Sequence, residues 1–438
     1  MIPGPNKNGR QSWLDGLRGI AAVIVAWFHF TVGEMQVPFR LFGEEPAEQN
    51  RYFIQLPPFR ILFAGQAMVS LFFVISGYSV PIAIIRLRGQ KGNAEFYRKI
   101  TSSVVRRGFR LYMPVLVLCI ISHLLFFVGA YHFVFGEGEG CAGAEPWSNG
   151  LSHFKCFILS ILSTLQLAGP YYTGGLNSQL WTMFVELKGS LAIYLTLLAL
   201  VSASSRTRAI TIACFASVFV FFGMHQFFCF FAGLLFAELD TMSSISPGST
   251  LPTMDIQKSS KTRSRLNQAV ILAVFALGTY LLCLPYNDDF PSDYWFPSDI
   301  DILPFWEGRS IRIYSWYSIG AVMLVGAIRH LTTIKNLLQT SLCRFLGEIS
   351  FSLYLLHQTV IRVFRNPILQ FVCWKLFGMG FRPTRDDEAG GYVYFLSWAV
   401  AAGVIGPVLV VSATFMARVI DRRSIALAYQ VEERLLGS

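Results

Sequence analysis

The sequence predicts an all-α integral membrane protein, a bundle of about ten transmembrane helices with one re-entrant or interfacial segment. The first observation is composition, because 53% of the 438 residues are hydrophobic and only 14% are charged. A soluble chain of this length does not bury that much apolar surface. The second is a series of long apolar stretches, and the third is the uneven distribution of basic residues between them.

The apolar stretches give the number of spans. A membrane helix needs about 17 to 25 apolar residues, and stretches of this kind lie at 13–32, 61–85, 109–130, 181–202, 208–224, 225–241, 267–285, 313–330, 345–365 and 393–417. The stretch at 154–167 has only about 14 residues, which fits a re-entrant or interfacial segment better. No small-residue cleavage site follows the first stretch, so we expect a retained span there and not a signal peptide.

Basic residues give the orientation. Residues 86–110 contain eight Lys or Arg against Glu95 alone, so this loop is expected to be cytoplasmic. If 154–167 does not cross, the basic segments at 205–208 and 258–265 are cytoplasmic too, and so are both termini. We therefore expect a multi-pass protein of the endoplasmic reticulum or another internal membrane. Its net charge of +10 is explained by these loops, so the expected partner is a lipid bilayer and not nucleic acid.

Residues 1–438 are expected to form a single transmembrane domain with a flexible cytoplasmic linker around 240–265, which is rich in Ser, Thr, Pro and Lys. The eight cysteines show no metal-ligand spacing, so no metal site is predicted. Cys141 and Cys156 would both lie on the outer side of the membrane. There they could form a disulfide or stay as two free thiols, and the sequence leaves both alternatives open.

Ionisable residues inside the spans are the candidate functional groups. Arg18 and His29 are eleven residues apart in the first span, which is three helical turns and about 16 Å. They therefore share one face, with the cation near the inner surface and the imidazole near the outer one. The alternative is that Arg18 reaches lipid headgroups and His29 only packs.

The third span begins with Arg107 and Arg110, which are adjacent on a helix face. Paired guanidinium groups suit phosphate oxygens, which they bind through two parallel hydrogen bonds. Anchoring of a cytoplasmic loop is the alternative. It explains Arg110 less well, because that residue already lies within the apolar run.

Two further spans contribute Glu186, five residues after Trp181, and His357 in the outer half of a late span. Glu186 would either orient an imidazole, as carboxylates do in acyl-transfer sites, or pair with an arginine. On the ten-span count, His29, Glu186 and His357 fall on the outer side. The arginines at 18, 107 and 110 fall on the inner side. This predicts a polar passage whose inner opening binds phosphate and whose acid–base residues lie deeper in the membrane.

As an ordered set, five sequence blocks resemble acyltransferase family 3 of multi-span membrane acyltransferases, in particular its fungal branch. The blocks are LDGLRG with a histidine ten residues beyond (14–29), LFFVISGY (71–78), RRGFRLYMP (106–114), LWTMFVELKGSLAIYL (180–195) and LGEISFSLYLLHQ (346–358). Tyr78 stands where the family has Phe or Leu, and we expect this change to affect packing only.

The resemblance implies a membrane-bound O-acyltransferase of fungal secondary metabolite biosynthesis. It would move an acyl group, most simply acetyl, from acyl-CoA to a hydroxyl of a small metabolite, lipid or sugar. The acyl-CoA is a donor substrate, and no bound cofactor is expected. His29 would be the catalytic base, with Glu186 orienting it. The CoA phosphates would bind Arg18, Arg107 and Arg110, and the cavity would contain Trp181 and His357. The competing function is a transporter that uses the same residues as an intramembrane relay.

Overall fold

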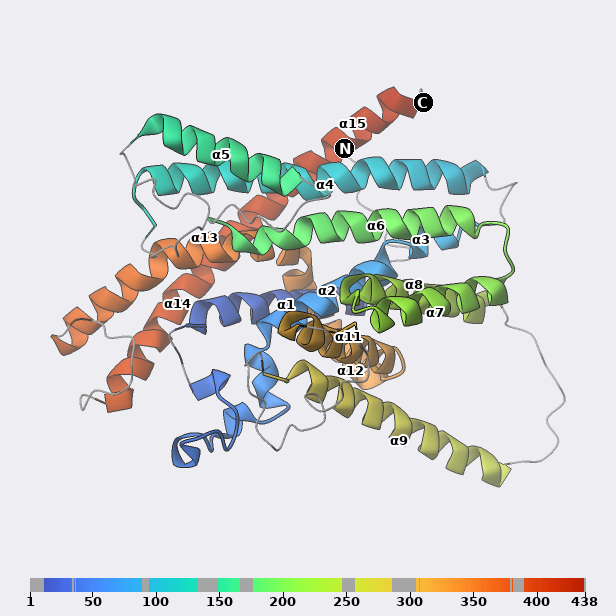
Figure 1. Ribbon diagram of the computed structural model, residues 1–438, viewed down its shortest axis with the longest axis horizontal. Helices are drawn as coiled ribbons and strands as arrows, with labels where there is room; N and C mark the ends of the chain where they lie inside the picture. Colours follow the sequence, from blue (N-terminus) through green and yellow to red (C-terminus); the bar gives the residue numbers. More distant parts are fainter. Residues whose placement is uncertain are drawn as a thin grey trace. The chain divides into compact units, whose positions relative to one another are not determined.

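All regular elements in the described part of the chain are helices (Figure 1). The computed structural model describes residues 12–33, 35, 37–88, 94–131, 149–165, 176–245, 257–285, 305–306, 308–378, 380 and 390–436. The helices are α1 (Ser12–Thr31), α2 (Gly65–Ser79), α3 (Ile82–Ile85), α4 (Ala94–Phe127), α5 (Gly150–Leu165), α6 (Trp181–Ala199), α7 (Ser205–Phe221), α8 (His225–Ile245), α9 (Gln257–Leu282), α11 (Arg309–Ile328), α12 (Thr332–Leu338), α13 (Ser341–Phe377), α14 (Gly390–Met416) and α15 (Arg422–Leu436).

Among the described residues, six helical segments are long and apolar enough to cross a membrane. They are Ser12–Thr31, Gly65–Ile85, Ala94–Phe127, Ser178–Ala199, Ser310–Ile328 and Val393–Arg434. The structure thus supports a multi-pass, all-helical membrane protein. It does not confirm the count of about ten spans. The other four predicted stretches do fall on helices, namely α7, α8, α9 and α13, but these have shorter apolar parts or more polar side chains.

The predicted flexible linker is helical at both of its ends. Residues 240–245 complete α8, and residues 257–264 form the start of α9. Between them, residues 246–256 lie outside the described part. A helix that leaves the membrane can continue with solvated polar side chains, so a Lys- and Ser-rich composition does not by itself end it.

The chain forms two compact units, which share the helices α1, α4, α6 and α13. The first comprises Met1–Ile24, Val37–Thr101 and Gly189–Gly347, and the second comprises Val25–Gln36, Ser102–Lys188 and Glu348–Ser438.

In the first unit, helices approach one another at glycines. A Cβ atom added at Gly77 of α2 would lie 2.3 Å from the Phe230 carbonyl oxygen of α8, and one at Gly233 would lie 2.3 Å from that of Val74. Such spacing requires glycine, because the two backbones are in contact. The glycine of the LFFVISGY block is therefore a packing requirement.

The same reasoning applies to the LDGLRG block. A Cβ atom at Gly16 would lie 1.9 Å from the Leu338 carbonyl oxygen, and one at Gly19 would lie 2.5 Å from the Gly347 nitrogen. The start of α1 therefore packs against the backbone of the α12–α13 segment. These glycines allow that approach, so the block is partly structural.

An ionic cluster lies in the first unit and consists of Tyr78, Arg88, Arg208, Glu238, Asp240 and Arg329. Within it, Glu238 is 2.6 Å from Arg88 and 3.4 Å from Arg208. Asp240 pairs with Arg329 and accepts a hydrogen bond from the Tyr78 hydroxyl. The expectation that Tyr78 affects packing only is thus wrong, because its hydroxyl group has a charged partner.

In the second unit, α6 runs antiparallel to α4. Glu186 contacts Arg107, whereas Asn177, just before α6, contacts Ser122 further along α4. The short helix α5 lies along the end of α4 (Figure 1), with the His153 ring 4.9 Å from that of Phe127. Because α4 and α6 run in opposite directions, α6 begins on the same side of the membrane as that on which α4 ends. That is the arrangement expected if α5 does not cross.

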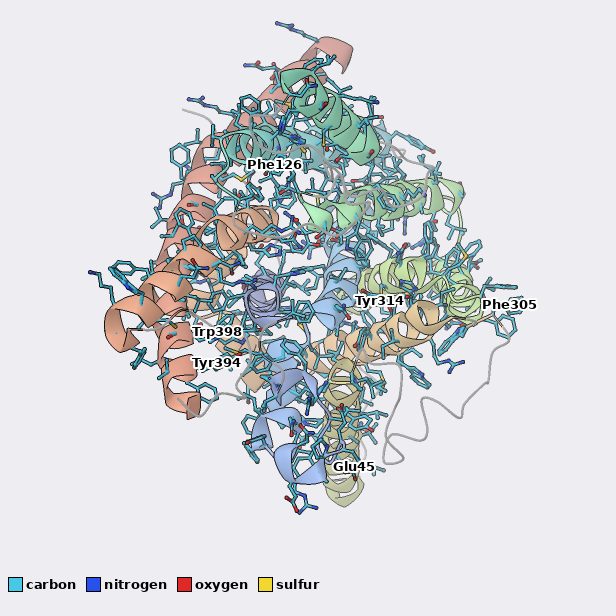
Figure 2. All side chains as sticks on the ribbon, turned by 60° about the vertical axis from the view of Figure 1, so that its left-hand side comes forward. Glu45, Phe126, Phe305, Tyr314, Tyr394 and Trp398 are labelled. Carbon is cyan, nitrogen blue, oxygen red and sulfur yellow. The ribbon has the colours of Figure 1, made fainter. Side chains whose placement is uncertain are left out.

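The apolar packing of α5 centres on Phe126 of α4 (Figure 2), whose ring lies 5.3 Å from that of His153. Cys156 of α5 is buried and disulfide-bonded. The partner that the sequence suggests, Cys141, lies outside the described residues.

Candidate active site

His29 and His357 lie side by side in the second unit. His29 is in the last turn of α1 and His357 is in the middle of α13, and their ring centroids are 5.0 Å apart with 36° between the planes. His357 is fully buried, whereas His29 is half-buried. The sequence placed both residues at one depth on different helices, and the structure brings their rings into contact.

The hydrogen bond of His357 fixes its tautomer. Its Nδ1 atom lies 2.6 Å from the Tyr354 carbonyl oxygen. A carbonyl only accepts, so Nδ1 carries the hydrogen and a neutral ring keeps its lone pair on Nε2. Nε2 is buried and has no hydrogen-bond partner among the described residues. Buried polar atoms are normally paired, so this acceptor beside His29 is a candidate contact for a substrate.

Side-chain hydrogen bonds hold α13 against α6 and α4 around this pair. Thr182 of α6 lies 3.0 Å from the Tyr354 hydroxyl, and the Gln179 amide donates to the Leu355 carbonyl at 2.7 Å. Further along, Thr359 donates to the Asn177 side chain at 3.1 Å. This network fixes the rotation of α13 and therefore the direction of His357.

A cavity of about 150 Å³ opens beside His29. It is lined by His29, Val32, Ser178, Gln358, Ile361, Arg362, Arg365 and Asn366. Sequence reasoning missed Arg362 and Arg365, although they repeat the three-residue spacing of Arg107 and Arg110. They stand at the end of the predicted 345–365 span, where an arginine is easily taken for an anchor.

The other side of the pair is packed. Phe30, next to His29, makes an edge-to-face contact with Trp398 of α14 at 4.9 Å. Figure 2 labels Trp398 and, one turn before it, Tyr394, whose ring centroid lies 6.1 Å from that of Trp398. These aromatic rings support the last turn of α1, which carries His29.

Glu186 pairs with Arg107, whose Nη2 atom lies 2.5 Å from Glu186 Oε2. The structure thus shows the arginine-partner alternative for Glu186, whereas its orienting role toward His29 stays a prediction. It also corrects the depth argument, which placed these two residues on opposite sides. An isolated buried carboxylate is costly, and the antiparallel crossing of α4 and α6 supplies the cation.

The remaining predicted residues belong to both units. Arg18 is half-buried in the first unit and donates to the Ser79 hydroxyl at 3.2 Å, with Asp15 3.4 Å away. Arg110 is exposed on α4, and Trp181 is the half-buried first residue of α6. Within the part of the chain that the structure describes, no group of three or more His, Cys, Asp or Glu would hold a metal ion.

The profile of a family described as an acyltransferase domain matches residues 11–417. The chain belongs to this acyltransferase family. It is therefore an enzyme that transfers acyl groups, and the resemblance found in the five sequence blocks is confirmed.

Three fungal relatives of this acyltransferase cover most of its length. It is 26% identical to the O-acetyltransferase PaAT-1 of Phomopsis amygdali, over 97% of this chain and 85% of the relative. It is 22% identical to the acyltransferase clz18 of Cochliobolus lunatus and 22% to the acyltransferase R4 of a Phoma species, in both cases over 86% of this chain and 88% of the relative. No solved structure matches this acyltransferase.

Proposed function

We propose that the acyltransferase moves an acyl group, most simply acetyl, from acyl-CoA to a hydroxyl of a small molecule, with the reaction taking place at His29. The observation that carries this proposal is that His29 lines a cavity in the second unit and has the ring of His357 against its own. The relative from Phomopsis is named an O-acetyltransferase, which supports both the hydroxyl acceptor and the acetyl group.

His29 is the general base in this mechanism. It takes the proton from the acceptor hydroxyl as the oxygen attacks the thioester carbonyl, since an imidazole has a pKa suited to this transfer near neutral pH. The tetrahedral intermediate collapses by breaking the carbon–sulfur bond. The CoA thiolate then takes the proton from the imidazolium, so the products are an ester and free CoA, and His29 is restored.

His357 lies against the ring of His29, which lines the cavity, and presents a lone pair at Nε2. This atom can accept a hydrogen bond from the acceptor hydroxyl or from the ring of His29, which holds the reacting groups together. Because the network on α6 fixes α13, the acceptor atom is in place before the substrate binds. Such preorganisation is the main contribution that a scaffold makes to a polar transition state.

Arg107 and Arg110 of the second unit would bind the donor's phosphates at the cytoplasmic mouth. The same role stays a prediction for Arg18, which belongs to the first unit. A guanidinium group has five N–H donors, so Arg107 can keep its contact with Glu186 and still receive a phosphate. In this proposal Glu186 holds Arg107 in position. The membrane is the endoplasmic reticulum or another internal membrane, with both termini in the cytoplasm, and the acceptor belongs to fungal secondary metabolism.

The test uses the purified full-length protein in lipid nanodiscs with radiolabelled acetyl-CoA and a panel of hydroxyl compounds. We expect label in an ester product and stoichiometric release of CoA. The same protein in proteoliposomes without any donor should show no solute counterflow. Counterflow without consumption of the thioester would indicate the transporter function and would overturn the proposal.

A further inference from the structure

The cavity beside His29 contains two arginines that the mechanism above does not use. Arg362 and Arg365 are one turn apart on α13, and both line the cavity together with the amides of Gln358 and Asn366. No Asp or Glu is among the described residues that line it. The wall next to the catalytic histidine is therefore positively charged and rich in hydrogen-bond donors.

Both guanidinium groups are held by backbone carbonyls. Arg365 is 5% exposed, and its Nη1 atom donates to the Phe30 carbonyl at 3.2 Å while Nε donates to Asn366 Oδ1 at 3.2 Å. Arg362 donates to the Leu176 carbonyl at 2.8 Å. These contacts tie the two arginines to the end of α1, where carbonyl groups lack helical partners, and to the segment before α6. These contacts orient both guanidinium groups.

We propose that Arg362 and Arg365 bind an anionic group of the acceptor, a carboxylate or a phosphate, a few bonds from the hydroxyl that reacts. The inference deepens the proposed function and rests on it, because it takes His29 as the base. A guanidinium pair with neighbouring amides matches the planar, multidentate hydrogen bonding of such anions. A cavity of about 150 Å³ is the size that holds one benzene ring in a protein core, so it admits only the reacting end of an acceptor.

The donor's own phosphates do not fit this place if the thioester reaches His29. About thirteen bonds separate the thioester sulfur from the nearest phosphorus in CoA. At roughly 3.6 Å per three bonds of an extended chain, that is about 15 Å, which is longer than a cavity of benzene size. A charge next to His29 therefore belongs to the acceptor. Neutral alcohols would lack these contacts, so the site would discriminate against them.

Binding is tested first, because it does not depend on turnover. The full-length protein in nanodiscs is titrated with sodium benzoate and with benzamide, which have the same ring and size but differ in charge. We expect benzoate to raise the midpoint of thermal unfolding and benzamide to leave it unchanged. Arg362→Gln should remove the benzoate shift and Arg362→Lys should keep part of it. Arg344→Gln, which alters an exposed arginine of the same helix, should keep all of it.

A second arm distinguishes the two sources of an anion. With saturating CoA present, the benzoate shift should persist, and Arg362→Gln should leave the binding of CoA unchanged. If CoA abolishes the shift and Arg362→Gln weakens CoA binding, the arginines hold a donor phosphate and the proposal is overturned. Equal shifts with benzoate and benzamide, or a full shift in Arg362→Gln, would overturn it as well.

The activity arm compares a 3-hydroxy fatty acid with its methyl ester as acceptors for acetyl-CoA. The acid should have the higher kcat/KM, by ten- to a hundredfold, and Arg362→Gln should remove most of that preference without changing the KM of the donor. Equal use of both acceptors would count against an anion site. Failure of the proposed function would give a different result. Benzoate would still bind, but no hydroxyl compound would be acylated in a His29-dependent way.

Discussion

Arg107 of α4 and Glu186 of α6 form an ion pair in which Nη2 and Oε2 are 2.5 Å apart. Both side chains are mostly buried, at 15% and 12% exposed. The pair fixes the antiparallel crossing of two helices that also supply the polar network behind His357. A residue predicted to bind phosphate and one predicted to serve the base are thus one structural unit.

Breaking this pair on one side should destabilise the protein. Glu186→Ala leaves a buried guanidinium without its carboxylate, which costs on the order of 3 kcal/mol in comparable sites. The free energy of unfolding, measured by denaturant titration in detergent, should fall accordingly. The double variant Arg107→Met with Glu186→Leu should recover most of the loss and still show a raised KM for acyl-CoA. A single variant as stable as the parent protein would show that the pair contributes nothing.

The Tyr78 hydroxyl should stabilise the first unit without serving catalysis. Tyr78→Phe removes the hydrogen bond to Asp240, and a hydrogen bond to a charged group contributes about 1.5 to 3 kcal/mol. Thermal unfolding should therefore occur at a lower temperature while kcat and KM stay the same. Unchanged stability would mean that Asp240 and Arg329 are sufficient without the hydroxyl group.

The glycines of the LDGLRG block should tolerate no side chain. Gly16→Ala places a Cβ atom on the Leu338 carbonyl oxygen, and crowding of a packed site costs about 1 to 3 kcal/mol or more. The yield of folded protein after size-exclusion chromatography should fall sharply. Gly403→Ala in α14, where a Cβ atom meets nothing within 4 Å, is the control and should fold normally. Equal yields would place the two helices further apart than described.

The two nitrogens of His357 should have separable roles. His357→Asn can still donate to the Tyr354 carbonyl but lacks an acceptor at the Nε2 position. The protein should therefore fold, while kcat should fall by about 100-fold, which is the lower end of the range for general acid–base groups. His357→Leu removes both functions and should also lower stability. Full turnover in a folded His357→Asn variant would reduce His357 to a packing residue.

The sequence was sufficient to predict the helical membrane class, the family and the common depth of the histidines at positions 29 and 357, whose rings are in contact. It was not sufficient for the partners of the charged residues, because periodicity gives the position of a side chain along its own helix and not the neighbouring helix. The separation in depth between Arg107 and Glu186 was misjudged for a physical reason. Helix α4 has 34 residues, about 51 Å, which is longer than the hydrocarbon core of roughly 30 Å. The position at which its apolar run begins or stops therefore does not mark a membrane surface.

Arg362 and Arg365 show a second limit. Both lie in α13, which is not among the six candidate spans of the described residues. In the sequence they look like the basic end of a helix. The folded structure places them in the wall of the cavity beside His29, with contacts to the Phe30 and Leu176 carbonyls.

The most direct test of the central claim is the rate of acyl transfer by His29→Ala in nanodiscs, measured with labelled acetyl-CoA beside the parent protein. His330→Ala, which changes an exposed histidine of the first unit, is the matched control. With His29 as the base, transfer should fall by at least 100-fold in His29→Ala and stay at the parent rate in His330→Ala, with equal amounts of folded protein. Transfer at the parent rate by a folded His29→Ala variant would contradict the account.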